Sequence, residues 1–207
     1  HLKKSMQSLS EALESSLRKT GVKIIFGQKV NSLNFDDANM CWKVSANSKK
    51  NSFIYHAKDL IYTAPPQSLL KHLKDPLKRK KNYKNRLNNL PDPSGALVFY
   101  SALKKENIKK TSSNHYQFVS NEFGSLFVSI SDDGDGRAPK GEVTLIASIF
   151  TKTKDWFDLD KKNYIKKKKD CMKKISLELE SQFDIDPENW LHRELATPLG
   201  FQKWTNR

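Results

Sequence analysis

The order of apolar and polar residues predicts a helix at the start of the chain. Four apolar side chains recur at three- and four-residue steps and so share one helix face: Met6, Leu9, Leu13 and Leu17. Ser8 and Glu11 stand at the spacing of a capping box, with Ser5 as an alternative N-cap. Gly21 is expected to stop the helix, because glycine readily adopts the left-handed conformation that ends many helices.

Short strands are predicted after this helix. Apolar runs between turn signals favour five strands, at residues 22–26, 29–35, 40–46, 53–57 and 60–63. Pro65 and Pro66 stop the last of these and pre-set the first turn of a short helix at residues 67–73. The first part of the chain therefore combines a helix, a strand and a β-meander.

The second half of the chain predicts a sheet with one buried face, followed by a long helix. Aromatic and β-branched residues alternate with small polar ones in four segments, at residues 96–100, 116–119, 126–130 and 143–150. Residues 161–183 carry an apolar stripe at helical spacing: Ile165, Met172, Ile175, Leu179 and Phe183. Together these elements indicate an α+β fold.

The net charge of +14, from 37 basic and 23 acidic residues, is concentrated in two runs. Residues 74–86 hold seven basic residues and one acid, and residues 161–174 hold eight lysines and one acid. Three interpretations are open: solvated helix faces, contact with anionic lipid headgroups, or nucleic-acid binding. Arginine, which contacts bases and phosphates in a bidentate manner, is scarce, so no nucleic-acid partner is expected.

Few residues form a pattern that carries chemistry. Cys41 and Cys171 make neither a disulfide framework nor a Cys/His cluster, so no metal site is expected. Asp132, Asp133 and Asp135 lack the closing glutamate of a calcium loop and favour a glycine-rich hairpin turn. His115 stands out at a strand start, where an exposed strand-edge histidine is the alternative interpretation. No apolar stretch is long enough to predict a membrane-spanning helix.

Four sequence segments, taken in their order along the chain, indicate a family resemblance. They are HLKKSMQSL at residues 1–9, GVKIIFGQKVNSL at 21–33, DLIYTAPP at 59–66 and ATPLGFQKWTNR at 196–207. This succession resembles the flavin-dependent carotenoid desaturases and isomerases, which are similar to bacterial phytoene desaturase and related to the amine oxidases. Three further segments resemble the cyanobacterial carotenoid 3,4-desaturase branch: residues 115–118, 125–131 and 134–139. Lys4 departs from the family, which has glycine at that position.

The resemblance implies an α+β fragment of an α/β flavoenzyme. Residues 1–66 are expected to be part of an FAD-binding domain, and residues 67–192 a mixed-sheet substrate-binding domain with the long helix. Residues 193–207 are expected to return towards the FAD domain. The GxGxxG motif that holds the FAD pyrophosphate is missing, so we expect the chain to be the middle of a longer enzyme and to be inactive by itself.

The cofactor implied by the resemblance is FAD, bound by the full-length parent. Val30 is expected near its adenine, and Thr63, Ala64 and Pro65 near the flavin. The implied chemistry is hydride transfer from a polyene to the flavin. Because the cofactor carries that chemistry, no catalytic residue is named.

The implied substrate is a carotenoid. His115 and Phe118 are expected to contact it, and Thr197 and Pro198 to lie where substrate and flavin meet. Four phenylalanines are candidates for the wall of an apolar tunnel, with ordinary sheet core as the alternative: Phe99, Phe118, Phe127 and Phe150.

The resemblance implies a cytoplasmic enzyme peripheral to a membrane, with the lysine runs docked on anionic lipid. Two alternatives to a desaturase stay open. One is a carotenoid cis–trans isomerase of the same superfamily. The other is a non-catalytic basic module that binds lipid or nucleic acid.

Overall fold

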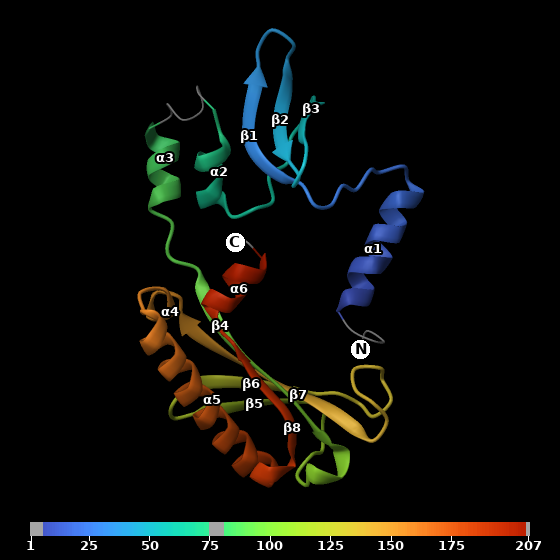
Figure 1. Ribbon diagram of the computed structural model, residues 1–207, viewed down its shortest axis with the longest axis vertical. Coiled ribbons are helices and arrows are strands. Elements are labelled where there is room, and N and C mark those ends of the chain that lie inside the picture. The colour runs from blue at the N-terminus through green and yellow to red at the C-terminus, as the bar shows by residue number, and fades with distance from the viewer. Residues whose placement is uncertain (1–5, 75–80, 206–207) are drawn as a thin grey trace. The chain divides into compact units, whose positions relative to one another are not determined.

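The computed structural model of the protein describes residues 6–74 and 81–205 (Figure 1). Lys4 and Ser5, singled out from the sequence, lie outside this range. The chain divides into two compact units: Ser16–Pro91 form one, and His1–Ser15 with Asp92–Asn206 form the other. The functional domains expected at 1–66, 67–192 and 193–207 stay predictions, because compactness does not test what a segment binds.

The opening helix α1 spans Gln7–Lys19. The expected capping box is wrong, because Ser8 lies inside the helix. The Nε2 of Gln7 instead donates to Oε1 of Glu11 at 2.7 Å, one helical turn away. The expected stop is confirmed: Gly21 has a φ of +81°, and its N–H donates to the carbonyl of Arg18.

The unit Ser16–Pro91 contains a three-stranded antiparallel sheet in the order β1-β2-β3. Its strands are β1 (Lys29–Asp36), β2 (Cys41–Asn47) and β3 (Ser52–Ala57), as the sequence predicts. Helix α2 covers Pro66–His72 and helix α3 covers Lys81–Asn88. The backbone N–H of Lys74 donates to the carbonyl of Leu33 at 3.0 Å and ties the end of α2 to β1.

Two strands expected in this unit are wrong. Residues 22–26 and 60–63 are irregular and pair with no neighbouring strand in the described part of the chain. Their apolar side chains are largely exposed, as at Phe26 and Ile61. An apolar run forms a strand only where a partner accepts its backbone hydrogen bonds, and the alternation of side chains does not supply that partner.

The second unit is built on a five-stranded sheet in the order β5-β6-β7-β4-β8. Four strands extend the predicted segments: β4 (Ser94–Lys104), β5 (His115–Ser120), β6 (Gly124–Ile130) and β7 (Glu142–Lys152). The fifth, β8 (Trp190–Ala196), was not predicted. The prediction of a mixed sheet is wrong, because every strand pairing in this sheet is antiparallel. Hairpins join β5, β6 and β7, and both neighbours of β4, which are β7 and β8, are antiparallel to it.

Short helical segments follow several strands of this unit along the chain. They are η2 (Lys105–Asn107), α4 (Lys154–Phe157), η3 (Pro187–Asn189) and α6 (Pro198–Thr205). The loop between β6 and β7 is the expected glycine-rich turn. Two of its carboxylates bond within the loop, since Asp133 accepts from the N–H of Gly141 and Asp135 accepts from Nε of Arg137. That of Asp132 accepts from Nδ2 of Asn114, just before β5.

The long helix α5 spans Lys161–Phe183, as predicted, and covers one face of the five-stranded sheet (Figure 1). Ile175, Leu179 and Phe183 from α5 share a core with buried residues of β4, β6 and β7. Among these are Phe99, Leu126 and Leu145, which are fully buried. We call this side of the sheet the covered face and the other side the open face.

The four phenylalanines proposed to line one tunnel lie on both faces. Phe99 and Phe118 belong to the covered face and its core, so the alternative of ordinary sheet core is correct for them. Phe127 and Phe150 are exposed on the open face. Successive side chains of a strand point to opposite faces, which places Phe99 on the other side of the sheet from Phe150. The α+β class is confirmed.

Candidate functional site

One end of the five-stranded sheet brings the sequence-predicted Thr197 and Pro198 together with residues that were not predicted. We call it the strand-end corner: Gly95 at the start of β4, Thr151 and Thr153 at the end of β7, and Thr197 with Pro198 where β8 passes into α6. A Cβ built on Gly95 would stand 2.8 Å from Cγ of Pro198 and 3.1 Å from the carbonyl oxygen of Thr151. Position 95 therefore requires glycine, because no side chain fits between these neighbours.

Thr197 holds this corner to α5. Its side chain is buried, with 1% of its surface exposed, and its hydroxyl shares a hydrogen bond of 2.9 Å with that of Tyr164. The same oxygen accepts from the backbone N–H of Gly200 at 3.3 Å in the first turn of α6. Pro198 is the first residue of α6, where its missing N–H is not needed. Thr197 therefore fixes the direction in which the chain leaves the sheet, and its expected place at a substrate–flavin junction stays a prediction.

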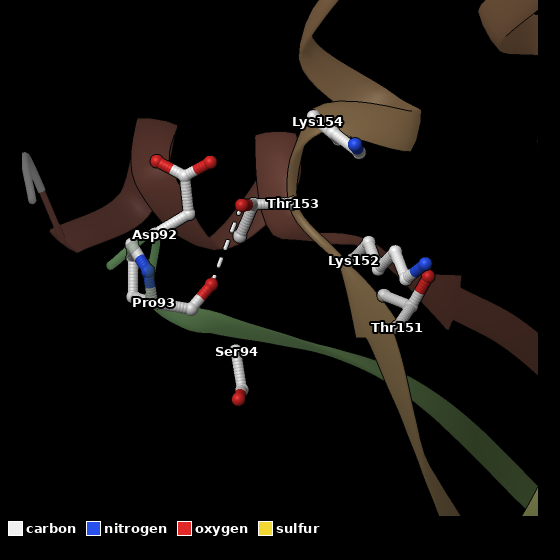
Figure 2. Close-up of a pocket in the computed structure, with 7 residues that line it drawn as sticks. All are labelled: Asp92, Pro93, Ser94, Thr151, Lys152, Thr153 and Lys154. Carbon is white, nitrogen blue, oxygen red and sulfur yellow. Dashed lines mark hydrogen bonds between the residues drawn. The ribbon is translucent and has the colours of Figure 1, made fainter.

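A polar pocket of about 230 Å³ opens beside the corner (Figure 2). Asp92, Pro93 and Ser94 form one side, and residues 151–154 form the other. The hydroxyl of Thr153 donates to the carbonyl of Pro93 at 3.3 Å across it. Ligand pockets for drug-sized molecules usually exceed about 300 Å³ and are mostly apolar, so this pocket does not suit a long apolar substrate.

The two residues expected to contact substrate from β5 are not brought together. His115 lies on the open face, where its ring stacks on Phe127 with centroids 5.8 Å apart. Phe118 points to the covered face and packs edge-on against Phe183 at 5.7 Å. They are three positions apart on one strand, and an odd separation places side chains on opposite faces. Their expected role as a pair in substrate contact stays a prediction.

The open face carries an apolar surface across four strands. Its large side chains come from β5, β6, β7 and β4: Val119, Phe127, Ile146, Phe150, Val98 and Tyr100. Val119 is 90% exposed, Phe150 78% and Phe127 45%. Phe150 immediately precedes Thr151 of the strand-end corner, but the two side chains point to opposite faces, so the corner lies on the covered side of the sheet.

Two rows of side chains cross the open face. Phe127 and Val98 both pair with Ser148, and Ser129 and Tyr100 both pair with Ile146. Phe127 and Phe150 were predicted from the sequence as candidates for an apolar binding surface, whereas Val119 and Tyr100 were not. The alternation of each strand holds that information, but only the strand order shows which alternating sets share a face.

The residues expected near FAD lie in the unit Ser16–Pro91. At Val30 the register of β1 against β2 jumps to Ser32, which leaves Asn31 out of the ladder on an edge strand. A bulge of this kind frees backbone groups for other partners. The carbonyl of Asn31 lies 3.4 Å from Nδ1 of His72, and the expected place of Val30 near an adenine stays a prediction.

Thr63, Ala64 and Pro65 form the connection into α2, and Thr63 and Pro65 are exposed. The hydroxyl of Ser68 donates to the carbonyl of Pro65 at 2.7 Å and shares a 2.6 Å hydrogen bond with that of Tyr62. This fixes a short exposed segment able to lie against a flat ring. Within the described residues no glycine-rich turn of the kind that holds a pyrophosphate leads from a strand into a helix, and the expected place of residues 63–65 near the flavin stays a prediction.

No protein-family model matches the sequence, and no curated protein matches it. One similar solved structure is that of RAB GDI from Plasmodium falciparum, at 16% sequence identity and a TM-score of 0.39. The match covers 83% of this chain and 31% of that one, so the chain spans about a third of its length. A likeness at this level carries no argument about function.

Proposed function

We propose that this chain is part of an FAD-dependent carotenoid desaturase, an oxidoreductase that acts on C–C bonds of a polyene. The ordered phrases that resemble this family support the proposal. The observation that carries it is the apolar open face of the five-stranded sheet, with Val119 and Phe150 among the most exposed apolar side chains. Exposed apolar side chains gathered on one face of a sheet suit contact with an apolar partner.

A polyene is long, flat and apolar, and the open face offers a surface of that kind. The rows through Ser148 and Ile146 alternate large apolar side chains with small hydroxyl-bearing ones. Burial of apolar area contributes ~25 cal/mol per Å², so an extended hydrocarbon gains affinity along its whole length. Phe150 would contact one end of that hydrocarbon on the open face.

FAD, when bound, accepts hydride from the substrate, and the protein binds and orients the two molecules. The backbone at Val30 and the exposed residues 63–65 would contribute edge contacts to the cofactor. Gly95, Thr197 and Pro198 would hold the end of the sheet in a fixed position. Loss of two hydrogen atoms would send a hydride to the flavin and a proton to water or a base, and no described residue is assigned as that base.

The proposal includes a peripheral position at the cytoplasmic side of a membrane, since carotenoids dissolve in bilayers. Among the described residues no helix has the length and apolar character needed to cross a bilayer. Most lysines of the run at 161–174 are exposed on α5. Lys167 is an exception, since its ammonium donates to the carbonyl of Asp155 and lies 4.9 Å from the centre of the Trp156 ring.

The test is the conversion of carotenoids by the longer protein expected to contain this chain, supplied with FAD and a membrane-dissolved polyene. A desaturase yields a product that lacks two hydrogen atoms and absorbs at longer wavelength. A product of unchanged mass would support the isomerase instead. Lipid or nucleic-acid binding without conversion would support the non-catalytic module.

A further inference from the structure

A second groove lies on the far side of the core from the open face, between α5, η3 and β8. It has a volume of about 310 Å³. Lys169, Met172, Lys173, Ser176 and Leu177 line it from α5, and Arg193 lines it from β8. The residues of α5 recur at helical spacing and share one face of that helix. We call this the α5–β8 groove.

The floor of the groove holds an unsatisfied polar group. Ser176 is 3% exposed, and its hydroxyl has no hydrogen-bond partner among the residues that the structure describes. Leaving a buried hydroxyl unpaired is unfavourable, and nearly all such groups in proteins have a partner. The oxygen itself is almost fully covered, so a rotation of the side chain would bring it to a ligand oxygen in the groove.

Positive charge surrounds that hydroxyl. Lys173 lies about one helical turn and Lys169 about two turns before Ser176 on α5, and Arg193 lines the groove from β8. The one acid in the lining is Glu180, whose Oε1 accepts from Nε1 of Trp190 at 2.7 Å and lies 3.7 Å from Nη1 of Arg193. Three cations against one engaged carboxylate favour an anion in the groove.

The remaining lining is apolar. Met172 and Leu177 come from α5 and Pro187 from η3, and Leu177 is more than half exposed. A free inorganic anion would leave this surface in water. An anionic amphiphile would cover it and place its charge beside the lysines.

We propose that the α5–β8 groove binds the phosphodiester headgroup of an anionic phospholipid. Lys169, Lys173 and Arg193 contact the phosphate oxygens, and the hydroxyl of Ser176 donates a hydrogen bond to one of them. Met172 and Leu177 contact the first carbons of an acyl chain. This inference rests on the proposed membrane contact and is independent of the flavin chemistry.

The experiment measures cosedimentation of the full chain with vesicles of phosphatidylcholine alone and of phosphatidylcholine with phosphatidylglycerol. Binding is expected only to the anionic vesicles. The double variant Lys169→Gln, Lys173→Gln is expected to weaken it about tenfold or more. The matched control removes the same charge from the same helix outside the groove, as Lys161→Gln, Lys162→Gln, and is expected to weaken it about twofold. Equal weakening by both pairs would overturn the proposal.

Ser176→Ala keeps every charge and isolates the hydroxyl. It is expected to weaken binding about fivefold while the urea midpoint of unfolding is unchanged or rises, because it removes an unpaired buried group. Unchanged binding by this variant would overturn the proposal.

Carotenoid conversion separates this inference from the proposed function. Groove variants that lose vesicle binding should retain conversion of a polyene presented in detergent. If the unmodified chain does not bind anionic vesicles, the lipid site is overturned and the proposed function is not. Absence of conversion with the lipid site intact would overturn the proposed function alone.

Discussion

Gly95 and Pro198 lie so close together that a Cβ on the glycine would stand 2.8 Å from Cγ of the proline. The two residues are far apart in the chain, one beginning β4 and the other beginning α6. Their contact sets the distance between the end of the sheet and the helix that follows it. The same Cβ would stand 3.1 Å from the carbonyl oxygen of Thr151 on the neighbouring strand, which limits how far β4 could shift away from the proline.

Gly95→Ala is therefore expected to destabilise the protein by about 1–3 kcal/mol, the usual cost of forcing an extra carbon into a packed site. Gly200→Ala is the matched control. A Cβ there would meet only Oγ1 of Thr197 at 3.7 Å, an ordinary contact, and alanine favours the helix. Urea unfolding followed by circular dichroism compares the two. Equal midpoints for both variants would contradict the close approach at Gly95.

The buried hydrogen bond between Thr197 and Tyr164 gives a second prediction. Thr197→Val removes an oxygen that two partners use, and we expect a loss of about 1–3 kcal/mol of unfolding free energy. Tyr164→Phe removes the shared bond from the other side. A double-mutant cycle should give a coupling of at least about 0.5 kcal/mol. Strictly additive effects would mean that the two hydroxyls do not depend on each other.

Much of the fold could be predicted from the sequence, and the exceptions have physical causes. Helix α5 was predicted because its apolar stripe repeats at helical spacing over many turns. Strand β8 was missed because it is an edge strand whose middle residues, Leu191 to Glu194, are all exposed and show no alternation. Residues 22–26 were predicted as a strand because an apolar run says nothing about whether a partner is available.

The candidate site could be predicted only in part. Thr197 and Pro198 were predicted from the segment at residues 196–207. Gly95 and Thr151 lie beside them because of the strand order, which the sequence does not reveal. His115 and Phe118 were expected at the substrate because their segment resembles the 3,4-desaturase branch, and the strand places them on opposite faces. The α5–β8 groove escaped prediction because Ser176 looks like a neutral helix residue until Arg193 of β8 is placed opposite it.

The cap of α5 predicts a pH dependence of stability. Asp160 is the N-cap, and a hydrogen bond from the backbone N–H of Asn163, at 2.9 Å, holds the pKa of its carboxyl below the ordinary value of 3.8. A group whose pKa is lowered on folding stabilises the protein above its unfolded pKa. This contribution is lost as the pH falls from 3.8 through the lowered folded value.

Asp160→Asn keeps a capping side chain but cannot titrate, so its urea midpoint should fall less than that of the unmodified chain between about pH 6 and about pH 2.5. Asp37→Asn serves as a control for general loss of an exposed carboxylate and should follow the unmodified chain. An equal fall in all three proteins would show that the cap makes no pH-dependent contribution.

The most direct measurement of the central claim is the rate of polyene conversion in the longer protein with Phe150→Ser on the open face. The control is Leu191→Ser, which removes an exposed apolar side chain from β8, at the end of the sheet away from the corner. If the open face binds the polyene, Phe150→Ser lowers the conversion rate at limiting substrate about tenfold, the loss expected for one buried aromatic contact, and Leu191→Ser leaves it unchanged. Equal rates for the two variants would contradict the account.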